Sequence, residues 1–369
     1  MKKRKQRRTK GWLVMLALVA MMTAVLAGCA GKEKKEEKKP ETKTEETKKE
    51  VRIFTDSAGR EVELPSEIQT AAPSGPLAQI VLYTACPDKL AGVAADFTED
   101  AKKYMESKYA ELPKFGQFYG KNANLNMEAL LKENPDVIID IGEAKETVKE
   151  DMDHLQKQLG IPVVFVESTM QTMDQTYHML GDLLGNPKEM ATLSDYSKKT
   201  IDHATKVAKE LKEEEQVSVY FALGDEGLNT NAKGSFHAEI VDLIGAKNIA
   251  EVEVTGQGAG SQVSMEQIMT WNPDVIFTYL DSVYDIITTS DTWAGLNAVK
   301  NQRVYKVPTA PYNFVSDPPS VNRMIGIDWM GSLLYPDSYE FSNEKMKAFY
   351  QGFYHIDLTD EQINEILGK

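Results

Sequence analysis

Apolar and polar positions alternate with two different periods along residues 51–369. Short apolar runs predict strands at Gln69–Ala72, Lys89–Ala94, Val137–Ile141, Val163–Val166, Val217–Ala222, Val275–Tyr279 and Arg303–Val307. Helical spacing predicts helices at Leu77–Thr84, Met127–Glu133, Lys145–Leu159 and Phe236–Ile244. Arg52–Thr55 and Arg60–Glu63 flank a turn sequence and predict a hairpin. This alternation is typical of an α/β protein with parallel, helix-covered sheets.

One long stretch departs from the alternation. Asp174–Glu215 has helical periodicity without a strand and is interrupted near Gly185-Asn186-Pro187. Its last section, Glu189–Glu215, would extend about 40 Å as a single helix. We interpret it as a rigid connector between two α/β units. The alternative is two ordinary surface helices of the first unit.

A repeat lies across this connector. Residues 127–138 (MEALLKENPDVI) return as residues 265–276 (MEQIMTWNPDVI), with seven of twelve positions identical and an offset of 265 − 127 = 138. Each copy predicts a short helix, a Pro-Asp turn and a buried strand. The chain is therefore expected to contain two Rossmann-like lobes. Ligands of such sheets bind beyond the carboxyl ends of the strands, which predicts a cleft between the lobes.

The N-terminal segment is a targeting sequence rather than part of the fold. Lys2–Lys10 carries seven cations, Trp12–Leu26 is apolar, and Leu26-Ala27-Gly28-Cys29 resembles a bacterial lipobox. An uncleaved anchor helix is the alternative. A stretch of Lys, Glu, Thr and Pro follows and predicts a disordered tether. The expected division is a signal peptide (1–28), lipidated Cys29 with the tether (29–50), a first lobe (51–185), a linker helix (186–215) and a second lobe (216–369).

Charge and cysteine content narrow the classes of partner. The formal charge is −14, and removing seven cations with residues 1–28 leaves −14 − 7 = −21. A surface this acidic disfavours nucleic acid and anionic membrane lipid as partners. We therefore expect the protein to contact the membrane only through the lipid attached to Cys29. The second cysteine, Cys86, lies in an apolar helical stretch and is interpreted as buried filler. We expect a monomer.

The lipobox, the charged tether, the long helix and the paired Met-Glu…Asn-Pro-Asp-Val-Ile motif together resemble a known family. They are similar to the solute-binding proteins of ABC importers for iron-siderophore, haem and vitamin B12. The resemblance implies a permease dimer with its ATPase as partner, docked through Glu128 and Glu266, and a small lobe closure. It places the protein on the outer face of the cell membrane. The tether and lipobox favour a Gram-positive surface over a periplasm.

Loops after the predicted strands supply the candidate ligand contacts. Helix starts at Ser74 and Ser235 would present free N–H groups to an anion. Aromatic and polar groups come from Gln117 and Tyr119 in the first lobe and from Tyr312, Asn313 and Arg323 in a segment that we expect to open a helix at Pro318. The alternatives are ordinary helix caps and core aromatics. The sequence predicts these residues as ligand-binding: Ser74, Gln117, Tyr119, Ser235, Tyr312, Asn313 and Arg323.

Three functions compete for these residues. The first is capture of an iron complex, foremost a ferric siderophore, with haem or cobalamin as variants; for haem, His237, Tyr119 or Tyr312 could ligate the iron. The second is a molybdate or tungstate binding protein, which hydroxyls and helix starts would suit. The third is a lipid-anchored hydrolase or metal enzyme, but the five histidines are scattered and there is no Gly-x-Ser-x-Gly motif. Gly256–Ser261 lacks the Lys-Ser/Thr of a P-loop. We expect no enzyme activity, no catalytic residue, no resident metal and no cofactor.

Overall fold

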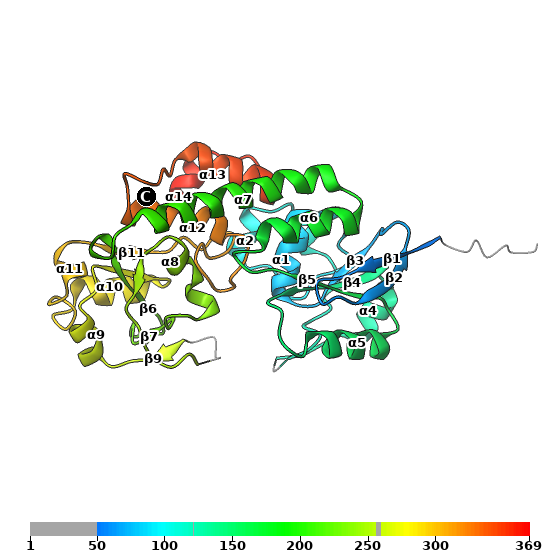
Figure 1. Cartoon of the computed structure of the whole chain (residues 1–369), viewed down its shortest axis with the longest axis horizontal. Helices are drawn as coiled ribbons and strands as arrows, with labels where there is room; N and C mark the ends of the chain where they lie inside the picture. The colour runs from blue at the N-terminus through cyan, green and yellow to red at the C-terminus, as the bar shows by residue number, and fades with distance from the viewer. Residues whose placement is uncertain (1–49, 121, 256–259) are drawn as a thin grey trace, which may run out of the picture. The chain divides into compact units, whose positions relative to one another are not determined.

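The first lobe is built on a three-stranded parallel sheet. The computed structural model describes residues 50–120, 122–255 and 260–369, which belong to one compact unit. The strands lie in the order β3 (Ala71–Pro73), β4 (Val137–Gly142) and β5 (Val163–Glu167), and all three are buried because helices cover them (Figure 1). The other elements are β1 (Val51–Thr55), β2 (Glu61–Pro65), α1 (Pro76–Ala85), η1 (Pro87–Lys89), α2 (Glu99–Lys103), α3 (Ser107–Ala110), α4 (Met127–Glu133), α5 (Val148–Leu159) and α6 (Met173–Leu184).

The second lobe repeats this design around a four-stranded parallel sheet. Its strand order is β11 (Val304–Lys306), β10 (Val275–Thr278), β6 (Ser218–Ala222) and β8 (Lys247–Asn248). A short antiparallel pair, β7 (Asn229–Thr230) and β9 (Ser261–Gln262), lies beside it. The helical elements are η3 (Phe236–Ala238), α8 (Glu239–Leu243), α9 (Met265–Trp271), α10 (Asp281–Thr289), α11 (Asn297–Lys300) and α12 (Arg323–Leu334). The predicted α/β class with two parallel sheets is confirmed.

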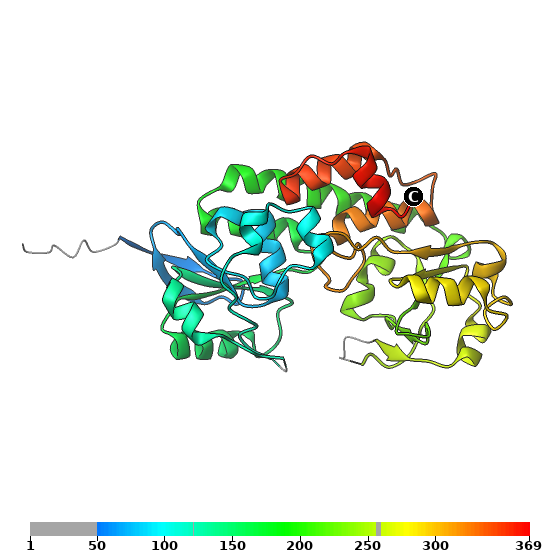
Figure 2. The ribbon, with the colours of Figure 1, turned by 180° about the vertical axis from the view of Figure 1, so that it is seen from behind.

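A single long helix joins the lobes. α7 (Pro187–Glu210) has 24 residues, or about 36 Å of length. Its buried side chains recur every three or four residues, from Met190 through Leu193 and Ser197 to Val207, so one stripe faces the protein. α7 packs against α6 of the first lobe and against α8 and α12 of the second (Figures 1 and 2). The helix ends before the 3₁₀ turn η2 (Glu213–Glu215), earlier than the periodicity predicted.

The C-terminal elements return to the first lobe. α13 (Asn343–Phe349) runs into the π-helical turn η4 (Tyr350–Tyr354), and α14 (Asp360–Ile366) follows. η4 contacts α1 and α7, and the ring of Tyr354 lies 6.2 Å from that of Tyr83 in α1. Residues numbered within the second lobe thus bury aromatic surface against the first. The sequence analysis did not foresee this return.

The repeated motif forms the same structure in both lobes. α4 and α9 each have seven residues, and each ends at an asparagine with left-handed backbone, Asn134 at φ 44° and Asn272 at φ 45°. Asparagine tolerates this conformation better than most residues, and it stops the helix so that the chain can turn into β4 or β10. The predicted boundaries of Met127–Glu133 are confirmed.

The Pro-Asp turn of each copy ties two strands together. The carboxylate of Asp136 accepts hydrogen bonds from the N–H groups of Gln69 (2.8 Å) and Thr70 (3.1 Å), just before β3. In the second lobe Asp274 accepts from the N–H (3.0 Å) and the hydroxyl (2.7 Å) of Ser218, the first residue of β6. Each aspartate therefore fixes the start of the neighbouring strand and the position of the motif helix.

Three predicted elements are wrong. Residues 89–94 form only isolated bridges, because the N–H groups of Ala94 and Ala95 bond to the Gln79 side chain at 2.7 and 2.9 Å instead of to a strand. The predicted helix Phe236–Ile244 divides into η3 and α8. The helix expected at Pro318 begins only at Arg323, since a residue followed by proline disfavours helical backbone.

Candidate functional site

Two adjoining cavities lie between the lobes. One of about 320 Å³ is lined mainly by second-lobe residues around β7 and η3, and one of about 290 Å³ mainly by first-lobe residues after β4. Glu143, Lys145 and Phe236 line both, so the two spaces are direct neighbours. The position beyond the carboxyl end of β4 is where open α/β sheets bind ligands. We refer to them as the second-lobe cavity and the first-lobe cavity.

Hydroxyl and amide groups line the second-lobe cavity. Its second-lobe residues are Thr230, Asn231, Ala232, Ser235, Phe236, His237, Val254, Thr255, Gly260 and Ser261. The hydroxyls of Thr230 and Ser235 are buried, and the described part of the chain offers neither a hydrogen-bond partner. An unpaired buried hydroxyl costs about 1–3 kcal/mol. Two of them beside one cavity are candidate donors to a ligand.

Two further polar groups of this cavity are fixed by neighbours. Asn231 donates from Nδ2 to the Tyr279 hydroxyl at 3.2 Å. His237 pairs through Nδ1 with the Ser316 hydroxyl at 2.6 Å. Burial lowers the pKa of His237, with a smaller contribution from Arg323 and an opposing one from Asp317. The imidazole is therefore neutral at pH 7, and the second-lobe side of the cavity carries polar groups without net charge.

A buried carboxylate organises the first-lobe cavity. Asp140, only 3% exposed near the end of β4, accepts hydrogen bonds from the Ser74 hydroxyl and, at 2.7 Å, from the Tyr119 hydroxyl. Burial raises the pKa of Asp140, while the two hydrogen bonds oppose that rise. Burial together with the Asp140 charge also raises the pKa of Tyr119, which keeps the phenol protonated. Asp140 thus holds the Tyr119 ring over the cavity.

The two cavities differ in charge. Asp140, Glu143 and Asp151 line the first-lobe cavity, where Lys145 is the only cation among the lining residues that the structure describes. The second-lobe cavity contains Glu143 and Lys145 at its shared border and otherwise uncharged groups. A negatively charged ligand would therefore be repelled from the first-lobe side and meet neutral hydrogen-bonding groups on the second-lobe side.

Comparison with known proteins decides the family. The model of the family described as periplasmic binding protein matches residues 78–311, which is more than half of the chain. The chain belongs to this family.

Several relatives match most of this chain. The ABC transporter substrate-binding lipoprotein YvrC of Bacillus subtilis is 26% identical over 88% of this chain and 97% of its own. The molybdate-binding protein MolA of Haemophilus influenzae is 26% identical over 82% and 91%. The structure of an ABC transporter solute binding protein from Sulfurospirillum deleyianum has a TM-score of 0.79 at 29% identity, covering 86% of this chain and 99% of that one.

These likenesses define the general activity. This chain is a substrate-binding protein of the ABC transporter type, and its relatives are transport proteins rather than enzymes. Substrate-binding proteins of ABC importers act outside the cytoplasm. The predicted family and fold are confirmed.

Four predicted ligand residues lie at or near the cavities. Tyr119 and Ser235 line them. Ser74 lies behind the first-lobe cavity as a donor to Asp140 rather than as a helix cap, and Gly75 is the N-cap of α1 with Pro76 next. Gln117 donates to the backbone oxygen of Tyr119 at 2.9 Å and so supports that loop. Ser235 precedes only a three-residue 3₁₀ turn, not the long helix that was expected.

The other three are not among the described residues that line the two cavities. Arg323 is 1% exposed and forms an ion pair with Glu239 at 2.7 Å, while its guanidinium stacks 4.8 Å from the Phe236 ring centre. The side-chain oxygen of Asn313 accepts two backbone hydrogen bonds of its own loop. The half-buried Tyr312 is hydrogen-bonded to Gln79. A direct ligand contact for these residues stays a prediction, since each is engaged within the protein.

Glu128 and Glu266 are both exposed in the first turns of α4 and α9. Negative charge is favoured there by the helix dipole. The equivalent placement of both residues agrees with a pair of contacts on a partner. Their docking role stays a prediction.

Some predictions fall outside the described residues, namely lipidated Cys29, the signal peptide, the tether up to residue 49 and the loop 256–259.

Within residues 50–120, 122–255 and 260–369, no helix is both long and apolar enough to cross a bilayer. That part of the chain also holds no cluster of three or more His, Cys, Asp or Glu suited to a metal ion. Cys86 is buried, and burial raises the pKa of its thiol to about 12.

The sequence analysis missed several lining residues. Thr230 and Asn231 lie in and after a two-residue strand too short to predict. Asp140 could have been found, because it is a carboxylate inside an otherwise apolar strand run. A buried charge in such a run requires partners, and partners beyond a strand end indicate a site.

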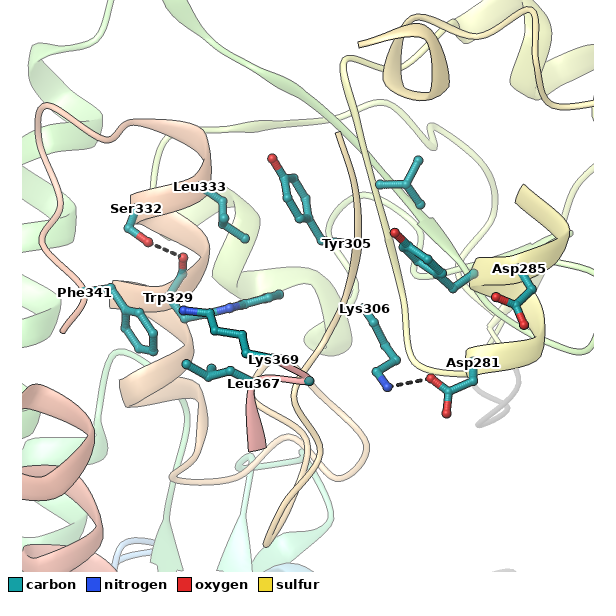
Figure 3. Close-up of a pocket in the computed structure, with 13 residues that line it drawn as sticks. Asp281, Asp285, Tyr305, Lys306, Trp329, Ser332, Leu333, Phe341, Leu367 and Lys369 are labelled. Atoms are coloured by element: carbon teal, nitrogen blue, oxygen red, sulfur yellow. Dashed lines mark hydrogen bonds and ion pairs between the residues drawn. The ribbon is translucent and has the colours of Figure 1, made fainter. Parts of the chain in front are cut away.

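A larger cavity of about 680 Å³ lies elsewhere in the second lobe, at the β11 edge of the sheet (Figure 3). Trp329, Leu333 and Phe341 face it from the α12 side, and Lys306 pairs with Asp281 at 2.5 Å across from them. Among the described residues, it shares no lining residue with the interlobe cavities and contains none of the predicted ligand residues. Size alone therefore does not locate the ligand site.

Proposed function

We propose that this protein is the lipid-anchored, extracytoplasmic component of an ABC importer that captures a compact oxyanion of the molybdate or tungstate type. The anchor is proposed from the sequence around Cys29. The ligand would be held non-covalently in the second-lobe cavity and released to the permease, with transport energy from a separate ATPase. No chemical step at the site is required.

One observation carries the ligand class. The hydroxyls of Thr230 and Ser235 are buried beside the second-lobe cavity without a partner among the described residues. An oxyanion has only acceptor oxygens, so it would accept from both hydroxyls at once. Charge-assisted hydrogen bonds of this kind are about twice as strong as neutral ones. Lys145 at the border of the cavity adds a cation beside the carboxylate of Glu143, and the relative MolA is by its name a molybdate-binding protein.

Uncharged hydrogen-bond donors in the cavity could bind an anion despite the negative net charge of the protein. With a formal charge near −21 after removal of the signal peptide (−14 − 7), the protein would repel a free anion at long range. Short-range donors within a buried cavity are screened much less than surface charges and can overcome that repulsion. We expect binding to strengthen modestly with salt, because salt weakens the long-range term more than the local one.

A second candidate is an iron complex, foremost a ferric siderophore. Tyr119 and Phe236 line the neighbouring cavities and could stack on a bulky chelate. A haem uptake protein of Staphylococcus aureus is a more distant relative, 22% identical over 58% of this chain. Tyr312 and Arg323 no longer favour this candidate, since both are engaged within the protein.

The deciding experiment is calorimetric titration of the purified protein with molybdate, tungstate, sulfate, ferric siderophores, haem and cyanocobalamin. Thr230→Val and Ser235→Ala should each weaken oxyanion binding about 10- to 100-fold, because each loses a hydrogen bond to a charged group. Neither should lower the unfolding midpoint of the ligand-free protein, since the hydroxyl that it removes has no partner among the described residues.

Ser320→Ala is the matched control. That hydroxyl is also buried and unpaired within the described chain, but it lines neither cavity. Its loss should leave the affinity unchanged. Binding of a ferric chelate without any oxyanion binding would refute the first candidate and favour the second.

We also propose that Glu128 and Glu266 dock on cations of the permease. Their matched exposure on α4 and α9 supports this role. Glu128→Gln and Glu266→Gln should reduce ligand-dependent ATPase activity of the reconstituted transporter, with ligand affinity unchanged. Lys132→Gln, an exposed charge on the same helix, is the control.

A further inference from the structure

The two motif helices carry a second matched feature besides their glutamates. Leu131 in α4 is 52% exposed and Met269 in α9 is 43% exposed. They occupy equivalent positions of the repeat, since 269 − 131 equals the offset of 138. Each follows its glutamate, Glu128 or Glu266, by three residues and so lies on the same face one turn later.

Single exposed apolar residues are common and need no explanation. The pairing is what sets these two apart. The exposed residue after each is polar in both copies, Lys132 and Thr270. The two helices differ at most of their non-identical positions in size or charge, yet this outward position is large and apolar in both. About half of each side chain faces outward, and the end of the Met269 side chain also lies beside Gly295.

Both residues are presented by rigid supports. α4 is capped by the side chain of Asn126 and α9 by a capping box on Ser264, and the left-handed asparagines close both helices. The aspartates of the Pro-Asp turns fix the strands that follow. A helix held at both ends pre-orders its exposed side chains, so little entropy is lost when a partner covers them.

We propose that Leu131 and Met269 are the apolar halves of two equivalent docking contacts, each paired with its glutamate. The inference rests on the proposed docking to a permease. The partner would be a twofold-symmetric membrane subunit pair that presents, at each contact, a cation beside an apolar recess. Charge complementarity supplies the cation, and the repetition of the surface in both lobes supplies the symmetry. The apolar contact would add affinity that salt does not screen.

The test uses the ABC permease–ATPase complex in membrane vesicles from the native cells. A photo-crosslinking residue is placed in turn at positions 128, 266, 131 and 269, with Ile286, an exposed apolar residue of α10, as the control position. Crosslinks from 131 and 269 to the same membrane subunit support the proposal. Crosslinks from 128 and 266 alone overturn it and leave the proposed docking intact, and crosslinks from none of the four overturn both.

Affinity for the same complex in lipid nanodiscs separates apolar from charged contacts. Leu131→Ser and Met269→Ser should each weaken binding about three- to tenfold, as expected for half-buried side chains that become fully buried. The loss should be the same at low and high salt, whereas Glu128→Gln should reduce the dependence on salt. Ile286→Ser should change nothing. Unchanged affinity for both serine variants, with unaltered unfolding midpoints, would overturn the proposal.

Discussion

Replacing Arg323 tests whether its guanidinium serves the fold or the ligand. Arg323 is 1% exposed, donates to Glu239 at 2.7 Å and to the Phe236 backbone oxygen at 3.1 Å, and stacks on the Phe236 ring. Arg323→Met removes the positive charge and leaves an apolar side chain of similar length. The Glu239 carboxylate then has lost its ion-pair partner. Both of its hydrogen bonds come from Nη1, while Nε is buried without a partner in the described chain.

The expected loss follows from the partner that remains. Breaking a buried ion pair by removing one member costs about 3–5 kcal/mol. The Glu239 side chain is 21% exposed, so water relieves part of that penalty, and we expect about 3 kcal/mol. Burial already raises the pKa of Glu239, and losing Arg323 removes the charge that opposes this rise. The penalty should therefore shrink as the pH falls and Glu239 takes up a proton.

Urea denaturation measures the loss, and a second substitution isolates its cause. Arg323→Met/Glu239→Leu removes both charges and should recover most of the stability, since paired burial is close to neutral overall. Ligand titration of this folded double variant then separates the two roles. An unchanged Kd supports a structural arginine. A double variant as stable as wild type that has lost binding would refute our reasoning and restore Arg323 as a ligand contact.

Three further predictions follow from single positions. Gly326→Ala should destabilise by about 3 kcal/mol or more in thermal unfolding, because its Cβ would lie 1.8 Å from the Phe314 carbonyl oxygen; a stability within 1 kcal/mol of wild type contradicts this. Asp274→Ala should cost about 2 kcal/mol in urea by leaving Ser218 donors unpaired, and Asp337→Ala, at an exposed site, is the control. The lowered pKa of His237 means that the folded state resists its protonation. Stability should therefore be complete above about pH 6.5 and fall as the pH drops below that value, and His237→Gln should flatten the slope of midpoint against pH; an unchanged slope contradicts the assignment.

The motif, the sheets and most of the helices could be predicted from the sequence because their causes are local. Helical spacing, an asparagine that stops α4 and α9, and Pro-Asp before an apolar run act within a few residues. Proline at the first position of α1 and the apolar stripe of α7 are local signals of the same kind. Local signals were weak at residues 89–94, which were predicted as a strand. There the backbone N–H groups of Ala94 and Ala95 donate to the Gln79 side chain instead of to a neighbouring strand.

The site itself was decided by contacts between distant parts of the chain. Arg323 could have faced a ligand or a buried carboxylate, and only the packing of α12 against α8 brought Glu239 to it, 84 positions away in sequence. Asp140 gained its role from Ser74 and Tyr119, on two other loops. The hydrogen-bond or ion-pair partner of a side chain depends on which groups lie near it in the folded protein. The spacing of residues along the sequence does not reveal those distant neighbours. The chain alone therefore determined the family and the two lobes, while the tertiary structure decided which polar groups are left open to a ligand.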